Sequence, residues 1–215
     1  MKKIFTLMIS LFVIAAFLPS CDDDDNPTTP DDTEFKIPLE PGNQWTYRAY
    51  TSGQGFTDTV THDIYGTTTY QGDKVYLMEG YFDLQEWYHI QKDDGFYMGN
   101  PDDVFVKYVP LPVDTAYKEY VSEEEILTWG EAEEYTDTVR RVVELIAADE
   151  TVNVPAGQFD CVVSSLHYES NEGERLSAGQ TLFYFASGTG VVKMTNTDLL
   201  LQSSGKELID FDLQQ

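Results

Sequence analysis

The feature that most constrains the fold is a series of short segments in which large and polar residues alternate, beginning at residue 44. In QWTYRAY, Trp45, Tyr47 and Ala49 alternate with polar neighbours, and similar segments follow at 74–82, 86–92, 103–109, 138–146, 159–168, 181–187, 190–196 and 206–213. Gly, Asn and Asp separate them. A period of two, broken by turn residues, indicates antiparallel strands in a meander.

About a dozen short strands curl rather than stay flat. The predicted fold class is therefore mainly β: an antiparallel meander forming a curved sheet, half-barrel or barrel, with at most one or two short helices. The helix candidate is SEEEILTWG (residues 122–130), where Ser122 and Glu125 form a capping box and Gly130 is a stop signal. An irregular acidic loop is the alternative for this segment.

One turn is specified closely by its residues. Pro155 presets the backbone for the first corner of a type I turn, and Gly157 falls at the last position, where Gly is favoured. Because both flanks are strand-like, we expect a hairpin with its turn at Val154 to Gly157.

The N-terminus has the pattern of a secretory signal peptide. Lys2 and Lys3 precede an apolar run over residues 4–18, which is short for a transmembrane helix of about 20 residues. A membrane anchor helix is the alternative. The following Leu18-Pro19-Ser20-Cys21 resembles the lipobox of bacterial lipoproteins, although Pro19 departs from its usual pattern. The resemblance implies cleavage between Ser20 and Cys21, and acylation of Cys21.

The expected organisation has three parts: a signal peptide at 1–20, the lipidated cysteine and an acidic flexible linker at 21–40, and a single β-rich domain at 41–215. Four aspartates follow Cys21. A cysteine followed by an acidic run resembles the export signal of surface lipoproteins in Bacteroidota, which implies display on the outer face of the outer membrane. The alternative is a solvated acidic linker on a lipoprotein that faces the periplasm.

The charge balance excludes one class of partner. Loss of residues 1–20 leaves 11 basic and 38 acidic residues, a formal net charge of −27. Nucleic-acid binding needs clustered Lys and Arg, so we expect no nucleic-acid partner. Membrane association is expected through the lipid anchor alone.

No motif for catalysis, a metal or a cofactor stands out, so we expect none of the three. After acylation of Cys21 only Cys161 remains, in an apolar strand where a buried, inert thiol is expected. His62, His89 and His167 fall on different expected strands. A hydrolase built from Ser164 or Ser165 with His167 requires that the fold bring the residues together in a cleft.

Three stretches carry a further family resemblance: PGNQWTYR (41–48), VNVPAGQFDC (152–161) and FASGTGVV (185–192). In this order they resemble a loose group of uncharacterised Bacteroidota-type lipoproteins with a single β-rich domain. Distant relatives look like the half-barrel of periplasmic lipoprotein carriers. The resemblance implies a half-barrel able to cradle a hydrophobic ligand and transfers no catalytic residue.

The expected function is that of a non-enzymatic, lipid-anchored envelope or cell-surface lipoprotein that binds a saccharide, peptide or lipid on the concave face of its sheet. Trp87, Tyr88 and Trp129 are the candidate stacking residues, with ordinary strand packing as the alternative. A lipid or lipoprotein carrier with an apolar cavity is the second hypothesis, and a hydrolase is the third.

Overall fold

The computed structural model describes residues 35–79, 87–99, 105–129, 134–170, 173–176, 179–198 and 202–214, without the side chains of 124–129 and 134–137. The strands formed by these residues are β1 (Gln44–Thr51), β2 (Gly55–Tyr70), β3 (Asp73–Met78), β4 (Trp87–Lys92), β5 (Gly95–Gly99), β6 (Val106–Pro110), β7 (Lys118–Trp129), β8 (Glu134–Val154), β9 (Gly157–Ser170), β10 (Gln180–Ala186), β11 (Gly190–Thr197) and β12 (Ser203–Asp212).

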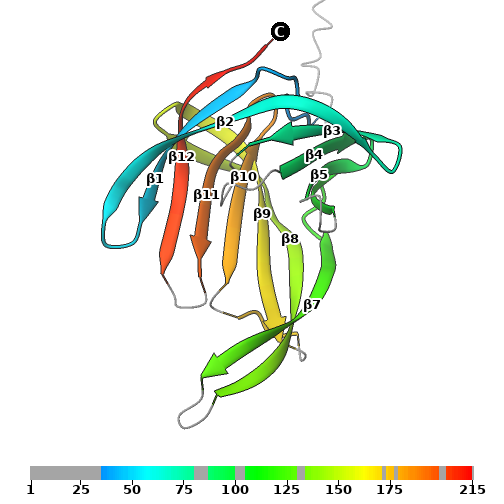
Figure 1. The fold of residues 1–215 in the computed structure, drawn as a ribbon, viewed down its shortest axis with the longest axis vertical. Helices are drawn as coiled ribbons and strands as arrows, with labels where there is room; N and C mark the ends of the chain where they lie inside the picture. The colour runs from blue at the N-terminus through cyan, green and yellow to red at the C-terminus, as the bar shows by residue number, and fades with distance from the viewer. Residues whose placement is uncertain are drawn as a thin grey trace, which may run out of the picture. The chain divides into compact units, whose positions relative to one another are not determined.

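These strands form one antiparallel sheet in the order β6-β5-β4-β3-β2-β1-β12-β11-β10-β9-β8-β7. Most neighbours are consecutive in sequence, as in a meander. The exception is β1, which pairs with β12, so the first strand (blue in Figure 1) lies beside the last (red). The sheet curls until β6 packs against β8 and β9, where the Ser164 hydroxyl donates to the Tyr108 carbonyl oxygen. The predicted fold class is confirmed: the sheet is barrel-shaped and nearly closed.

Large side chains fill the concave face of this sheet. Leu145, Ser164, Phe183 and Met194 lie in register on neighbouring strands and are buried. Across the interior, the ring of Tyr108 meets that of Phe183 at a centroid distance of 5.0 Å. A packed interior of this kind stabilises the barrel through burial of apolar area.

The end of the interior beside the β10–β11 turn also carries buried groups. Trp45 is 2% exposed, and its indole N–H donates to the Thr189 carbonyl oxygen at 2.6 Å. Ile37 and Leu39, from the end of the segment predicted as linker, are 4% and 5% exposed and belong to the core. Residues 35–40 are therefore packed against the strands.

The helix expected at 122–130 is wrong, because residues 122–129 belong to β7, and Gly130 lies outside the described residues. From Lys118 to Trp129 the chain pairs with β8 between Glu134 and Glu144. A capping box contributes about 1 kcal/mol, whereas the ladder satisfies the backbone of the whole strand. The expected hairpin is confirmed, since Val154 pairs with Gly157 across the β8–β9 turn. No helix in the described part of the chain has the length and apolar character needed to cross a membrane.

Candidate functional site

The outer face of β3, β4 and β5 carries a groove, and strand register places its residues there. Across β4 and β5, His89 pairs with Met98 and Ile90 with Tyr97. Met98 is a buried core residue, so Ile90 and Tyr97 point to the opposite, outer side of the sheet. On this hairpin, His89 and Met98 therefore face the core, whereas Ile90 and Tyr97 face the outer surface.

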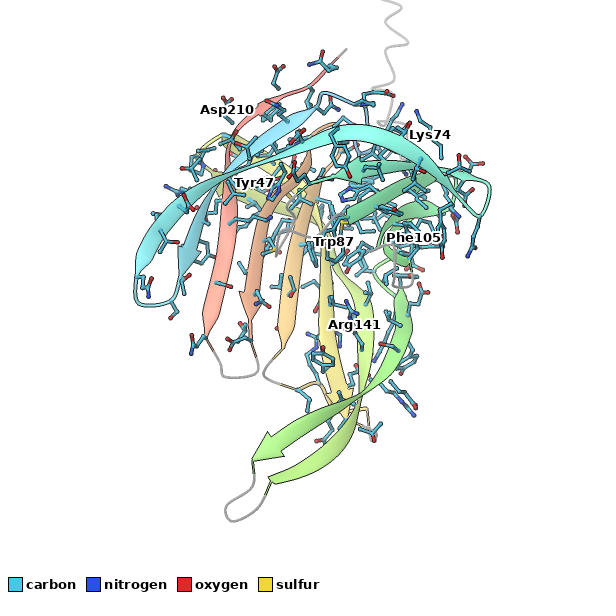
Figure 2. The ribbon with its side chains drawn as sticks, viewed as in Figure 1. Tyr47, Lys74, Trp87, Phe105, Arg141 and Asp210 are labelled. Carbon is cyan, nitrogen blue, oxygen red and sulfur yellow. The ribbon has the colours of Figure 1, made fainter. Side chains whose placement is uncertain are left out.

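This outer groove consists of two adjoining hollows. The aromatic hollow, with a volume of about 350 Å³, is lined by Tyr70, Gln71, Asp73, Ile90, Lys92, Tyr97 and Phe105. The lysine hollow, about 300 Å³, is lined by Lys36, Ile37, Leu39, Glu40, Asp73, Lys74, Tyr76, Ile90, Gln91 and Lys92. Asp73, Ile90 and Lys92 belong to both hollows, so the two form one continuous surface. Figure 2 shows Lys74 and Phe105 on this side of the molecule.

Ion pairs lie between and beside the hollows. The Lys92 ammonium lies 2.5 Å from a carboxylate oxygen of Asp73, and this hydrogen bond raises the pKa of Lys92. At the rim, Asp94 accepts hydrogen bonds from Lys107 at 2.6 Å and from the Tyr97 hydroxyl at 2.7 Å. The hydrogen bond from Lys107 is the main cause of the lowered pKa of Asp94. The groove thus presents fixed charges beside half-buried rings.

On the concave face, where we expected the binding surface, Phe96, Phe183 and Phe185 are buried in the core. The cavity at its open end is lined by Trp45, Met78, His89 and Phe96, among others, and holds about 10 Å³. One water molecule needs about that much room. Aromatic side chains thus occupy the part of the concave face that the described residues form, and binding on that face stays a prediction.

A buried polar pair lies within the interior. Lys206 is 5% exposed, and its ammonium donates to Nε2 of His62 at 2.8 Å. The Nδ1 atom of His62 lies 3.1 Å from the Glu79 carbonyl oxygen, which fits a neutral ring that donates from Nδ1 and accepts at Nε2. Burial lowers the pKa of Lys206 to about 7 and that of His62 to about 3. Sequence reasoning missed this pair, whose members are 144 positions apart.

A second polar cluster lies under the outer face of β9. Ser165, His167 and Glu169 alternate along the strand and share one side. The Ser165 hydroxyl lies 3.1 Å from Nδ1 of His167, and Nε2 of His167 lies 3.2 Å from a Glu169 oxygen. Lys118 donates to that same oxygen at 2.6 Å. Burial lowers the pKa of His167, against the opposing effect of Glu169.

The hydrogen-bonded order Ser–His–Glu is that of a catalytic relay, so the fold does bring His167 to Ser165. Both side chains are fully buried at 0% exposure. The side chains of Gln180 and Arg175 cover this pair. Gln180 donates a hydrogen bond to the Ser165 hydroxyl. Arg175 contacts both Nδ1 of His167 and a carboxylate oxygen of Glu144. A substrate that approached the hydroxyl from this side would have to displace these two side chains.

The remaining candidate residues are placed as follows. Trp87 is half-buried and packs against the core, while half-buried Tyr88 points outward, its ring 6.1 Å from that of Phe105. The side chain of Trp129, and Ser20 and Cys21, lie outside the described residues. Cys161 is buried and free, and burial raises the pKa of its thiol to about 12, as an inert thiol requires.

Among the described residues, no group of three or more His, Cys, Asp or Glu is arranged to hold a metal ion. This agrees with the positions of the histidines, since His62, His89 and His167 belong to β2, β4 and β9.

Comparison with known proteins identifies the fold. No protein-family model matches the sequence, and no curated protein matches it. Among solved structures, a protein from Bacteroides fragilis described as exported and as having a YmcC-like fold is 16% identical, with a TM-score of 0.53, and the match covers 83% of this chain and 99% of that one. The class is therefore that of all-β domains with a YmcC-like fold.

Two further structures resemble the chain less well. A protein described as a lipoprotein from Parabacteroides distasonis is 15% identical, with a TM-score of 0.48, and the match covers 82% of this chain and 97% of that one. The hypothetical lipoprotein YmcC from Escherichia coli is 12% identical, with a TM-score of 0.36, and the match covers 86% and 90%. The resemblance to β-rich proteins of Bacteroidota type is confirmed at the level of fold by the B. fragilis protein.

Proposed function

We propose that the protein is a non-enzymatic, lipid-anchored envelope lipoprotein whose β-domain binds a ligand at the outer groove. The observation that carries the proposal is the contrast between the two faces of the sheet. The described residues of the interior form a packed core, whereas the outer face holds adjoining hollows of about 350 and 300 Å³. Ligand sites are concave, with apolar walls and a few fixed polar groups, and the outer groove has both.

Two observations support the anchor. The segment ending in Cys21 has the lipobox pattern, and the B. fragilis protein that shares the fold is described as exported. Two or more acyl chains hold a protein stably on a membrane, whereas one does not. The acidic run after Cys21 favours outer-membrane display at the cell surface, with the periplasmic face as the alternative.

Detergent phase partition tests the anchor. Cells that express the wild-type protein are expected to yield it in the detergent phase, and a Cys21→Ser variant is expected in the aqueous phase or as an unprocessed precursor. Wild-type protein in the aqueous phase, with an unmodified Cys21 by mass spectrometry, overturns the anchor. Protease treatment of intact cells then separates the two faces: loss of the domain without lysis places it outside.

The groove is tested by a ligand screen on the wild-type protein and on Phe105→Ala. Because Phe105 forms a wall of the aromatic hollow, its truncation is expected to weaken binding by at least about fivefold, the usual threshold for an important contact. The matched control is Tyr120→Ala, which removes an exposed ring (58% exposed) on β7. Equal loss in both variants, or in neither, contradicts binding at the outer groove.

The two rival functions are opposed by specific features. A carrier for a hydrophobic cargo needs an apolar cavity of hundreds of Å³, and the interior cavity that Trp45, Met78, His89 and Phe96 line holds about 10 Å³. A hydrolase needs a reachable nucleophile, and Ser165 is 0% exposed. A fluorophosphonate probe tests the second rival directly: we expect no labelling of the folded protein, and labelling that is lost in Ser165→Ala overturns the non-enzymatic proposal.

A further inference from the structure

We infer that the ligand of the outer groove is an acidic glycan, whose sugar rings lie over the aromatic hollow and whose anionic groups meet the lysine hollow. The inference rests on the proposed binding function of this groove. The supporting observation is that aromatic rings line one hollow and lysines line the other, on a chain that is otherwise strongly acidic.

Several basic residues gather at this groove. Four of the 11 that follow residue 20 lie in it or at its rim: Lys36, Lys74, Lys92 and Lys107. The rim residue Lys107 is held by Asp94. In the lysine hollow itself, three lysines face two carboxylates, those of Glu40 and Asp73.

A local excess of positive charge is unusual on a chain with 38 acidic residues. Lys92 is engaged by Asp73 at 2.5 Å, so Lys36 and Lys74 are the cations most available to an incoming anion. The Lys74 ammonium lies 4.4 Å from the ring centroid of Tyr76, which fixes it at the wall of the hollow. Fixed cations beside a ring favour carboxylate or sulfate groups on the ligand.

The aromatic hollow supplies the complementary surface for sugar rings. The rings of Tyr70 and Phe105 meet at a centroid distance of 5.0 Å and a tilt of 54°, which makes an angled wall. Ile90 forms the floor at 3% exposure. Sugars present apolar C–H faces together with hydroxyl groups, so an aromatic wall beside the side chains of Gln71, Asp73 and Lys92 suits them. A fatty chain would displace water from these polar groups without replacing its hydrogen bonds.

The two hollows share Asp73, Ile90 and Lys92, so one extended ligand can reach both. A chain of sugars with regularly spaced acidic groups fits this arrangement, because rings and anions then alternate along the ligand. An anionic membrane surface is the other occupant that such lysines attract, but it makes no use of the angled wall of Tyr70 and Phe105.

The test uses two matched pairs of polymers with the mature protein in neutral detergent micelles: polygalacturonate with its methyl ester, and dextran sulfate with dextran. Affinity electrophoresis measures each dissociation constant. We expect the acidic member of at least one pair to bind at least about tenfold more tightly than the neutral member. The double variant Lys36→Ala/Lys74→Ala is expected to lose about fivefold for the acidic polymer, the combined effect of two exposed ion pairs.

Two further variants separate the contributions. Phe105→Ala is expected to weaken binding of acidic and neutral polymers alike, while Lys193→Ala, a lysine on the outer face of β11, serves as the control and is expected to change neither. Binding of neutral polymers alone, weakened by Phe105→Ala and unaffected by the lysine variants, overturns the acidic class and leaves the proposed function standing.

Other outcomes are equally decisive. If no polymer binds, and phosphatidylglycerol vesicles bind in a manner that depends on Lys36 and Lys74, the occupant is a membrane surface and the glycan inference is overturned. If some other ligand binds and no groove variant alters its affinity, the proposed function fails together with the inference.

Discussion

Replacement of the buried Lys206 by methionine is expected to stabilise the protein at neutral pH. The Lys206 ammonium lies inside the barrel, 2.8 Å from Nε2 of His62 and 5.1 Å from the ring centroid of Tyr47. Burial lowers its pKa from 10.5 to about 7. The folded state therefore holds this proton less tightly than the unfolded state does, which reduces stability wherever the unfolded lysine is charged.

The magnitude follows from the pKa difference. Each pKa unit corresponds to about 1.4 kcal/mol, so a shift from 10.5 to about 7 costs roughly 4 kcal/mol at pH 7. Methionine has a similar length and removes this cost, but it leaves Nε2 of His62 without its lysine donor, at about 1–3 kcal/mol. The net expectation for Lys206→Met at pH 7 is a gain of about 2 kcal/mol, or a rise of roughly 4–8 °C in Tm.

The sign of the effect changes with pH. Between pH 7 and 10.5 the wild-type protein gains stability as pH rises, because the unfolded lysine still binds a proton that the folded lysine has released. By pH 10 the cost of burial has fallen to about 1 kcal/mol, which is less than the roughly 2 kcal/mol lost with the hydrogen bond. The variant is then expected to be less stable than the wild-type protein by about 1 kcal/mol.

Urea denaturation at pH 7, 8.5 and 10 measures these differences, with Lys193→Met as the control for loss of a surface lysine. The control is expected to stay within about 0.5 kcal/mol of the wild-type protein at every pH. A Lys206→Met variant that is less stable at pH 7, with a difference that does not vary up to pH 10, refutes the reasoning.

Two further predictions concern the buried histidines and two glycines. Burial lowers the pKa of His62 and of His89 to about 3, so acidification from pH 7 to 5 protonates these histidines only in the unfolded chain. The free energy of unfolding is therefore expected to fall by about 2 kcal/mol for each histidine. Equal urea midpoints at the two pH values contradict this. At Gly205 an added Cβ falls 2.4 Å from the Met194 carbonyl oxygen, so Gly205→Ala is expected to cost about 1–3 kcal/mol of stability. At Gly66 the nearest atom to an added Cβ is 3.9 Å away. In thermal unfolding, Gly66→Ala is therefore expected to be neutral or mildly stabilising.

The sheet could be predicted from the sequence because alternation is a local signal. The segments at 44–50 and 159–168 show it clearly, and both became strands. Three strands escaped notice for different reasons. The strand β5 has only five residues, two of them glycines. Along β2 most side chains are exposed, so the strand lacks the alternation of large and polar residues, and in β7 a run of three glutamates imitates the start of a helix.

The site could not be predicted, because its residues come together only through the fold. Lys36 precedes the first strand, Tyr70 ends β2, and Phe105 precedes β6. Nothing in the spacing of such residues indicates that they share one face. The concave face was expected to bind because curved sheets often enclose ligands, but whether side chains fill a curve depends on their sizes in register, which a single sequence does not reveal.

The central claim is that the interior is closed by packing and that ligands meet the outside of the sheet. Methyl-resolved NMR of the mature protein, titrated separately with a trigalacturonate and a lysophospholipid, tests it most directly. The account predicts that trigalacturonate shifts the Ile90 methyl signals at the outer groove and that neither compound shifts those of Met98, Met194 or Leu208 in the core. Saturable shifts of the core methyl groups with the lysophospholipid, and none at Ile90 with the sugar, would contradict the account.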